Sequence, residues 1–295
     1  MAAATGPLSA AHAGTLTLGD LTVNRLGFGA MRITGKGIWG PPENRQGALA
    51  TLRRAVELDV NCIDTADSYG PNVSEELIAE ALWPYPKGLV IGTKAGWERH
   101  GPGVWQHNAA PRHIQEAIEG SLRRLRLERI DVYQLHIPDP ATSFDASMES
   151  LARLREQGKV RHVGLSNVTL EHLERARKIV PIVSVQNRYS FSDREWDYLL
   201  DHCQAHGIVF MPWGPIAQGR EANNVVAKIA SARGVSTAVV SLAWLLKRSP
   251  VTLPIPGTSS VTHLEENIGA AAFQLTDAEF AELAKVVPTP ISLRK

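Results

Sequence analysis

The feature that most constrains the fold of this 295-residue chain is a regular alternation between short apolar runs and longer amphipathic segments. The runs of strand length begin with "RLGFG" at Arg25–Gly29 and end with "VTLPIPG" at Val251–Gly257, and helical spacing follows each of them. We count eight such strand–helix units. This order predicts a parallel sheet with right-handed crossovers, and eight units in this length predict an α/β fold of the closed (β/α)8 TIM barrel type. An open doubly wound sheet is the alternative.

The two ends of the chain add elements to this pattern. Alternating residues on both sides of Gly19-Asp20 predict an N-terminal β-hairpin. Two helical segments precede the last strand, and two more follow it at 260–270 and 277–287. Because no break in composition divides the chain, we expect a flexible N-terminal tail over residues 1–14 and a single barrel domain over 15–295.

Charge and cysteine content exclude several classes of protein. The 31 basic and 30 acidic residues nearly cancel, which gives no support to a nucleic-acid or membrane-surface partner. Cys62 and Cys203 lie far apart and form neither a disulfide framework nor a metal-ligand cluster, so we expect a cytoplasmic protein without a metal site. The first residues lack the basic and apolar regions of a signal peptide. No segment approaches the roughly 18 apolar residues of a membrane span.

Chemically active side chains stand at the ends of three consecutive predicted strands. Asp64 ends the second strand, Lys94 the third and His136 the fourth, and Tyr69 follows closely after Asp64. Neighbouring strands lie about 4.8 Å apart, so these residues are expected within roughly 10 Å of each other. In a barrel they would meet at the carboxyl ends of the strands, where active sites are built. Taken singly, each has a structural explanation as a turn, rim or packing residue, but the combination favours catalysis.

This set of four suits the reduction of a carbonyl group. The carbonyl oxygen gains negative charge as hydride reaches the carbon, so it requires a proton donor. Tyr69 has an ordinary pKa near 10, and we expect Lys94 to lower it, with Asp64 keeping the lysine charged and in place. His136 can donate a second hydrogen bond to the same oxygen. None of these side chains carries hydride, so a nicotinamide cofactor is required.

Polar and aromatic residues at the later strand ends could hold such a cofactor. Ser166, Asn167 and Gln186 offer a hydroxyl and amides for a carboxamide, and Trp213 offers a plane for stacking. The segment "IPGTSSVTHLEEN" leads from the eighth strand through hydroxyl residues into a helix N-terminus, where barrels often bind phosphate. Helix capping and rim packing are the structural alternatives. The earlier segment "GFGAMR" lacks the third glycine of a dinucleotide fingerprint, so we reject it as a Rossmann loop.

The motifs "IDTADSYG", "VIGTK", "VYQLH", "GLSN", "VQN" and "IPGTSSVTHLEEN" occur here in the order found in aldo-keto reductases, and the chain resembles that family from Thr15 to the last helix. The resemblance implies a catalytic tetrad of Asp64, Tyr69, Lys94 and His136. It also implies that NADPH, with NADH as the alternative, reduces a small-molecule carbonyl substrate. Together with "GPPENR", the last motif is similar to the pyridoxal reductase group.

The same resemblance implies a set of cofactor-binding residues: Gly29, Ala30, Met31, Ser166, Asn167, Gln186, Trp213, Gly214, Pro215, Ile216, Gly257, Thr258, Ser259, Ser260, His263, Glu266 and Asn267. Trp213 stands where the family usually has a stacking tyrosine. Gly257 and His263 stand where well-known NADPH-binding members carry a lysine and an arginine for the 2′-phosphate. The strand-eight loop therefore offers hydroxyls and backbone amides to phosphate, but no permanent cation.

Three tryptophans are candidates for the substrate pocket. Trp39, Trp97 and Trp105 lie on the predicted loops after the first and third strands, where they could surround an apolar or aromatic carbonyl or pack beneath the loops. Two other functions remain open. One is a cofactor-binding regulatory subunit of the same fold with little turnover. The other is an unrelated barrel lyase or isomerase that uses Lys94 to form a Schiff base.

Overall fold

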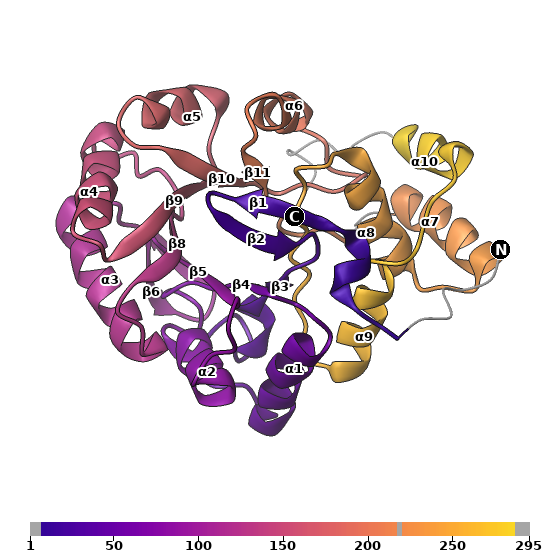
Figure 1. Ribbon diagram of the computed structural model, residues 1–295, viewed down its shortest axis with the longest axis horizontal. Helices are drawn as coiled ribbons and strands as arrows, with labels where there is room; N and C mark the ends of the chain where they lie inside the picture. Colours follow the sequence, from indigo (N-terminus) through magenta and orange to yellow (C-terminus); the bar gives the residue numbers. More distant parts are fainter. Residues whose placement is uncertain (1–6, 217–219, 287–295) are drawn as a thin grey trace.

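The main element of the computed structural model is a parallel sheet that curls into a ring, with helices on its outer side (Figure 1). The structure describes residues 7–216 and 220–286. The sheet has the strand order β11-β10-β9-β8-β5-β4-β3. Its strands are β3 (Phe28–Gly29), β4 (Cys62–Asp64), β5 (Val90–Ala95), β8 (Ile130–Leu135), β9 (Val160–Ser166), β10 (Ile182–Gln186) and β11 (Val209–Phe210).

The predicted eighth strand, Val251–Gly257, lies between the two ends of this sheet. On the side of β11, the amide of Leu253 donates to the carbonyl of Phe210, and the amide of Phe210 donates to the carbonyl of Val251, both at 2.9 Å. A parallel bridge between Phe210 and Thr252 marks the same contact. The segment therefore extends the ring beyond β11.

The other side of this segment closes the ring against β3. The amides of Gly27 and Gly29 donate to the carbonyls of Pro254 and Pro256 at 2.9 and 3.2 Å. Prolines have no N–H, so neither residue can return a hydrogen bond, which explains why the segment forms no regular ladder here. The closed barrel is confirmed, and the open doubly wound sheet is excluded.

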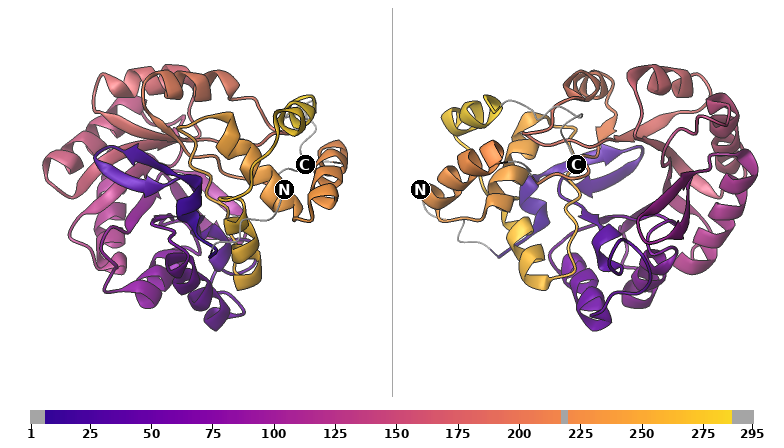
Figure 2. Two further views of the ribbon diagram at one scale, coloured as in Figure 1. Left: turned by 45° about the vertical axis from the view of Figure 1, so that its right-hand side comes forward. Right: turned by 180° about the vertical axis from the view of Figure 1, so that it is seen from behind.

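The helices follow the predicted order. They are α1 (Arg45–Glu57), α2 (Val73–Leu82), α3 (Pro111–Leu125), α4 (Phe144–Glu156), α5 (Leu170–Arg177), α6 (Asp197–Ala205), α7 (Arg220–Arg233), α8 (Thr237–Arg248), α9 (Val261–Gly269) and α10 (Asp277–Ala284). Two of them, α7 and α8, separate β11 from the closing segment, as predicted. Helices α7, α8 and α10 gather on one side of the ring (Figure 2). The additional C-terminal helices α9 and α10 are confirmed.

The predicted N-terminal hairpin is also confirmed. It consists of β1 (Thr15–Leu18) and β2 (Leu21–Asn24), which pair antiparallel and lie across the middle of the ring (Figure 1). Leu18 and Val23 are fully buried against residues that point into the barrel from the amino ends of its strands, namely Cys62, Val90, Val132 and Val209. This hairpin closes the end of the barrel opposite to the catalytic residues.

Part of the predicted flexible tail is ordered. Residues Ala10–Ala13 form the 3-10 helix η1, and Ala10 is completely buried. Ser9 caps this helix by accepting a hydrogen bond from the amide of Ala11, and its hydroxyl donates to Asp59 at 2.5 Å. The prediction of a flexible tail was therefore wrong for the segment from Ser9 to Ala13. One buried alanine and a serine cap hold this segment in place. Residues 1–6 and 287–295 lie outside the described residues, so the domain limits remain a prediction.

A second hairpin follows β5 and was not predicted. Its strands are β6 (Trp97–Gly101) and β7 (Val104–His107), and they pair antiparallel with a register shift after Arg99. The sequence "WERHGPGVWQH" contains the signal, since two short runs that each carry a tryptophan flank a Gly-Pro-Gly turn. Trp97 and Trp105 thus lie on strands and not on irregular loops.

Cys62 and Cys203 are both buried free thiols. Among the described residues, no single helix is long and apolar enough to cross a membrane, although Asn224–Arg233 and Thr237–Arg248 together meet the length and hydropathy criteria across a bend of 100°.

Candidate active site

The alternation of side chains along the strands explains why the catalytic candidates point into the barrel. In β5, Thr93 faces outward and donates to the buried carboxylate of Glu75 on α2 at 2.6 Å. Its neighbour Lys94 faces inward, because successive side chains of a strand point to opposite faces. Lys94 is in register with Gln134 on β8, and His136 follows two residues later on the same face. Asp64 is the last residue of β4.

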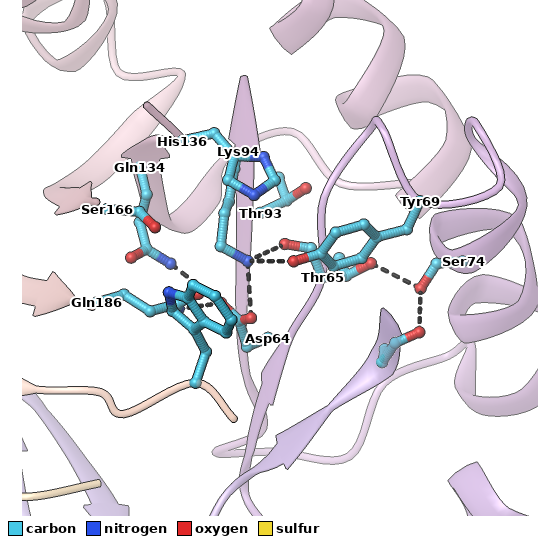
Figure 3. Close-up of polar contacts among 12 residues, drawn as sticks. Asp64, Thr65, Tyr69, Ser74, Thr93, Lys94, Gln134, His136, Ser166 and Gln186 are labelled. Carbon is cyan, nitrogen blue, oxygen red and sulfur yellow. Dashed lines mark hydrogen bonds and ion pairs between the residues drawn. The ribbon is translucent and has the colours of Figure 1, made fainter. Parts of the chain in front are cut away.

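Lys94 is the centre of a buried polar cluster (Figure 3). Its ammonium nitrogen lies 2.7 Å from a carboxylate oxygen of Asp64, 2.7 Å from the carbonyl oxygen of Thr65 and 3.5 Å from the hydroxyl of Tyr69. Lys94, Asp64 and Tyr69 are 0%, 2% and 6% exposed. A buried ammonium requires such partners, since an unpaired charge in this environment would be strongly destabilising.

Burial and charge in this cluster shift the pKa values of Lys94 and Tyr69. Burial alone would lower the pKa of Lys94, but Asp64 and Tyr69 outweigh it, so the pKa lies above its usual value and the lysine is charged. Burial raises the pKa of Tyr69, and the opposing effect of Lys94 does not overcome it. The prediction that Lys94 brings the pKa of Tyr69 below its ordinary value was therefore wrong. The phenol is protonated at neutral pH.

The second carboxylate oxygen of Asp64 accepts hydrogen bonds from two glutamines. The side-chain amides of Gln134 and Gln186 donate to it at 3.0 and 2.9 Å. Gln186 was expected to hold a cofactor carboxamide, and the structure gives it this additional partner. Gln134 was missed, although its position two residues before His136 on the same face could have indicated it. Gly164 makes room for Gln134, because a Cβ atom there would lie 2.9 Å from its Cγ.

His136 lies beside Tyr69 at the upper edge of the cluster. The two rings meet edge to face with their centroids 5.7 Å apart, and the ring of Trp97 also meets His136 edge to face, with a centroid distance of 6.4 Å. The Nδ1 atom lies 3.4 Å from the hydroxyl of Ser68. Burial, together with the charge of Lys94, holds the pKa of His136 well below its usual value. The imidazole is therefore neutral at neutral pH.

A cavity of about 460 Å³ opens above this cluster. It extends from Tyr69 and His136 to the segment that closes the barrel. Ten of the residues predicted to bind the cofactor line it: Gly29, Met31, Ser166, Asn167, Gln186, Trp213, Gly214, Pro215, Ile216 and Gly257. The structure thus brings the four catalytic candidates and most cofactor candidates to one site.

Ser166, Asn167 and Trp213 are held together by hydrogen bonds within this wall. The side-chain amide of Asn167 donates to the hydroxyl of Ser166 and to the carbonyl of His136, both at 3.0 Å. The indole N–H of Trp213 donates to the side-chain oxygen of Asn167 at 3.1 Å. Asn167 has a positive φ of 56°, a conformation that asparagine adopts more readily than most residues. These contacts fix the plane of Trp213 beside the strand ends.

Seven predicted cofactor residues lie outside this cavity. Ala30 is completely buried, and its carbonyl accepts a hydrogen bond from Ser74. Thr258 and Ser260 bind the start of α9, with Thr258 accepting from the amide of Ser260 and Ser260 from that of His263. The remaining members of this group are Ser259, Glu266 and Asn267.

Two arginines that sequence reasoning missed also line the cavity. Arg188 forms an ion pair with Asp193 at 2.9 Å, and its guanidinium lies 5.6 Å from the ring centroid of Trp213. Arg32 is exposed and runs beside Gly257, where a Cβ atom would lie 3.5 Å from its Cγ. The side chain of Arg32 therefore runs past the position where NADPH-binding members of the family carry a lysine. No pattern in the sequence indicated this contact between distant loops.

The three tryptophans have different positions. Trp105 lines the cavity directly. Trp97 packs against His107 and His136, and Trp39 lies beneath the guanidinium of Arg99 at 5.7 Å. Only Trp105 is thus placed by the structure at the cavity surface, while the other two support the wall behind it.

Comparison with known proteins identifies the family. Residues 25–288 match the model of the aldo/keto reductase family. The chain belongs to this family. Among its relatives, pyridoxine 4-dehydrogenase of Escherichia coli is 42% identical over 276 residues, which cover 91% of this chain and 96% of the relative. An uncharacterised oxidoreductase of Schizosaccharomyces pombe is 46% identical over 283 residues, 95% and 92% of the two chains.

Solved structures of aldo-keto reductases share the fold. An aldo-keto reductase from Klebsiella pneumoniae in complex with NADPH is 27% identical, with a TM-score of 0.79 and coverage of 94% of this chain and 96% of its own. A glycerol dehydrogenase from Gluconobacter oxydans is 26% identical, with a TM-score of 0.83 and coverage of 96% and 99%. Both comparisons span nearly the whole barrel.

Proposed function

We propose that this aldo-keto reductase uses NADPH to reduce aldehydes or ketones to alcohols, with Tyr69 as the proton donor and pyridoxal as a substrate. The observation that carries this proposal is the position of Tyr69. Its hydroxyl lies 3.5 Å from the buried ammonium of Lys94, and both Tyr69 and His136 line the cavity. A phenol, a cation and an imidazole therefore converge on the place where a carbonyl oxygen would be reduced.

The charges of the site support proton donation by Tyr69. An acid must hold its proton until the substrate oxygen becomes basic, and burial keeps the phenol protonated. Once the proton leaves, the phenolate is stabilised by the ammonium of Lys94. Asp64 keeps that ammonium charged, and Gln134 and Gln186 in turn hold Asp64. The same group is thus a stable phenol before the reaction and a stabilised anion after it.

His136 supports the substrate oxygen in a second way. A neutral imidazole has one N–H donor and one acceptor nitrogen. With the hydroxyl of Ser68 donating to Nδ1, we assign the proton to Nε2, where it can be donated to the substrate. A neutral donor next to Lys94 avoids a second buried cation, which agrees with the lowered pKa of His136.

The residues around the cavity fit a nicotinamide cofactor, which would supply the hydride. Ser166 and Asn167 offer polar groups to a carboxamide, and Trp213 offers an aromatic plane. Arg32 offers a cation for phosphate beside Gly257. The Klebsiella pneumoniae relative was solved with NADPH, which supports this choice of cofactor. The 42% identity to pyridoxine 4-dehydrogenase supports pyridoxal as the substrate.

The buried ion pair argues against the lyase alternative. An amine must lose its proton to form a Schiff base, and the raised pKa of Lys94 opposes this. If Lys94 did react, borohydride treatment with a carbonyl substrate would leave a covalent adduct on it. We expect none by mass spectrometry.

The proposal is tested by following NADPH oxidation with pyridoxal, other aromatic aldehydes, aliphatic aldehydes and ketones. We expect turnover with pyridoxal and formation of pyridoxine, and slower turnover when NADH replaces NADPH. Cofactor binding without oxidation for any carbonyl would instead support a regulatory protein. Turnover with other aldehydes but not pyridoxal would disprove the substrate assignment alone.

A further inference from the structure

Arg99 is a buried cation in the β6–β7 hairpin, which borders the cavity through Trp105. It lies on β6 directly opposite Trp105 on β7, and it is 9% exposed. Side chains at opposite positions of an antiparallel pair project from the same face. The guanidinium carbon accordingly lies 3.7 Å from the ring centroid of Trp105 and 5.7 Å from that of Trp39. Arg99 is therefore stacked directly behind the tryptophan that lines the cavity.

The guanidinium also joins three segments that are distant in sequence. One nitrogen donates to the carbonyl of Ser68 at 3.0 Å, and another donates to the carbonyl of Gly37 at 3.1 Å. Its Nε donates to the carbonyl of Val104 within the hairpin at 3.1 Å. In the described part of the chain, no carboxylate lies within ion-pair distance of Arg99. Its N–H groups instead donate to backbone carbonyls.

Two of these contacts lead toward the catalytic residues. Ser68 directly precedes Tyr69, and its hydroxyl lies 3.4 Å from Nδ1 of His136. The segment of Gly37 continues to Gly40, whose amide donates to the carbonyl of Gly70 at 2.6 Å. The loop that carries Tyr69 is thus held from both sides by elements that Arg99 connects.

We propose that Arg99 is a positioning residue that sets the substrate preference of the site by fixing Trp105 and by holding Ser68 against His136. The inference rests on the proposed carbonyl reduction. Arginine suits this role because its planar group can stack on indole while its N–H groups point at three carbonyls, an arrangement that lysine cannot reproduce. The hairpin thereby acts as the wall for an aromatic substrate, and its orientation depends on one side chain.

The test compares Arg99→Lys and Arg99→Met with the wild type, using an aromatic and a small aliphatic aldehyde. We expect KM for the aromatic aldehyde to rise about tenfold, a loss of ~1.4 kcal/mol of binding, with a much smaller change for the aliphatic one. NADPH binding, followed by quenching of tryptophan fluorescence, should change less than about twofold. An equal rise in KM for both aldehydes, or no change in KM for the aromatic one, would overturn the proposal.

Arg25→Lys is the matched control. Arg25 likewise donates to backbone carbonyls, those of Leu246 at 2.8 Å and Ser249 at 2.7 Å, but it does not line the cavity. Its replacement should lower the thermal midpoint without changing selectivity between aldehydes. A shift in selectivity equal to that of Arg99→Lys would show that general loosening, and not positioning, is responsible.

Three further measurements separate the parts of the proposal. Trp105→Leu should reproduce the rise in KM, and Ser68→Ala should lower kcat with little change in KM. Nitrogen NMR of His136 should show a single tautomer in the wild type and a mixture in Arg99→Lys, whether or not the protein turns over. One unchanged tautomer in both would overturn the link to His136. A wild type that reduces no carbonyl would refute the proposed function and leave the NMR result to decide on Arg99.

Discussion

The two hairpins of this barrel have the same topology and opposite roles. The β1–β2 hairpin covers the amino ends of the strands and inserts Leu18 and Val23 into an apolar cluster. The β6–β7 hairpin follows β5 and places Trp105 and a stacked arginine beside the cavity. One end of the ring is thus filled by apolar packing, whereas the other keeps an opening lined by polar and aromatic groups.

Because of this difference, residues at the closed end of the barrel mainly determine stability, whereas residues at the open end mainly determine the reaction. Removing buried apolar atoms at the closed end costs free energy of unfolding, because a cavity remains. Exchanging polar atoms at the open end changes the reaction while leaving most packing intact. Substitutions at the two ends should therefore have distinct and separable consequences.

The largest expected effect is on catalysis at the open end. Tyr69→Phe removes the proposed proton donor and should reduce kcat about 10²- to 10⁴-fold, the usual contribution of a general acid. NADPH binding and the thermal midpoint should remain close to those of the wild type. The matched control is Tyr133→Phe, since Tyr133 is buried on the outer face of β8 and its hydroxyl has no partner among the described residues. Near-normal turnover of Tyr69→Phe would exclude the assigned role.

At the closed end, Leu18→Ala should destabilise the fold by about 2–5 kcal/mol, as truncation of a buried leucine usually does. Leu18 is 1% exposed. Urea unfolding measures the loss, and kcat/KM of the folded protein should be unchanged. Leu16→Ala serves as the control, because Leu16 is only partly buried and should lose less. A fall in kcat/KM for Leu18→Ala would show that the two ends are coupled.

A smaller effect is expected for the cation beside Gly257. Arg32→Gln should raise the dissociation constant of NADPH about threefold to tenfold, as for the loss of ~1 kcal/mol from one exposed ionic contact. An equal loss for NADH would locate the contact at the pyrophosphate, and a loss for NADPH alone would locate it at the 2′-phosphate. Lys36→Gln removes a neighbouring exposed charge that does not line the cavity, and it should have no effect. Unchanged binding of both cofactors would contradict this role.

The smallest effect concerns pH. The pKa of His136 in the folded protein lies below the value of about 6.5 expected for an unfolded chain. The unfolded chain therefore binds more protons just below pH 6.5, and the free energy of unfolding must fall as the pH decreases through this range. His136→Gln should weaken this dependence, measured by urea unfolding between about pH 7 and pH 5. Some dependence will remain, since burial also lowers the pKa of His113 and His172. An identical dependence in the variant would refute the assignment to His136.

Much of the fold could be predicted because its signals are local. Strand and helix periodicity gave the order of elements, and the Gly19-Asp20 turn gave the first hairpin. The second hairpin carries an equally local signal around its Gly-Pro-Gly turn, which the prediction overlooked. The docking of η1 was different, because the burial of Ala10 depends on contact with a distant helix end at Leu58.

The catalytic candidates could be predicted for the same reason, as strand ends of a barrel converge. The pairing of Asp64 with Lys94 was predicted, but other contacts were not, since they depend on side-chain reach across the ring. Gln186 reaches Asp64 from another strand, and Arg32 reaches Gly257 from another loop. The net pKa of Tyr69 likewise depends on the balance between burial and the charge of Lys94, which residue types alone do not determine.

The proline-containing segment that closes the ring has a consequence for access to the cavity. Because Pro254 and Pro256 accept hydrogen bonds but return none, this seam has fewer bonds to break than a regular parallel ladder. Gly29, Ile255, Pro256 and Gly257 also line the cavity. Two backbone hydrogen bonds from glycines hold this seam on the β3 side, and it borders the cavity that we propose for the cofactor, so widening the cavity along the seam would break few backbone bonds.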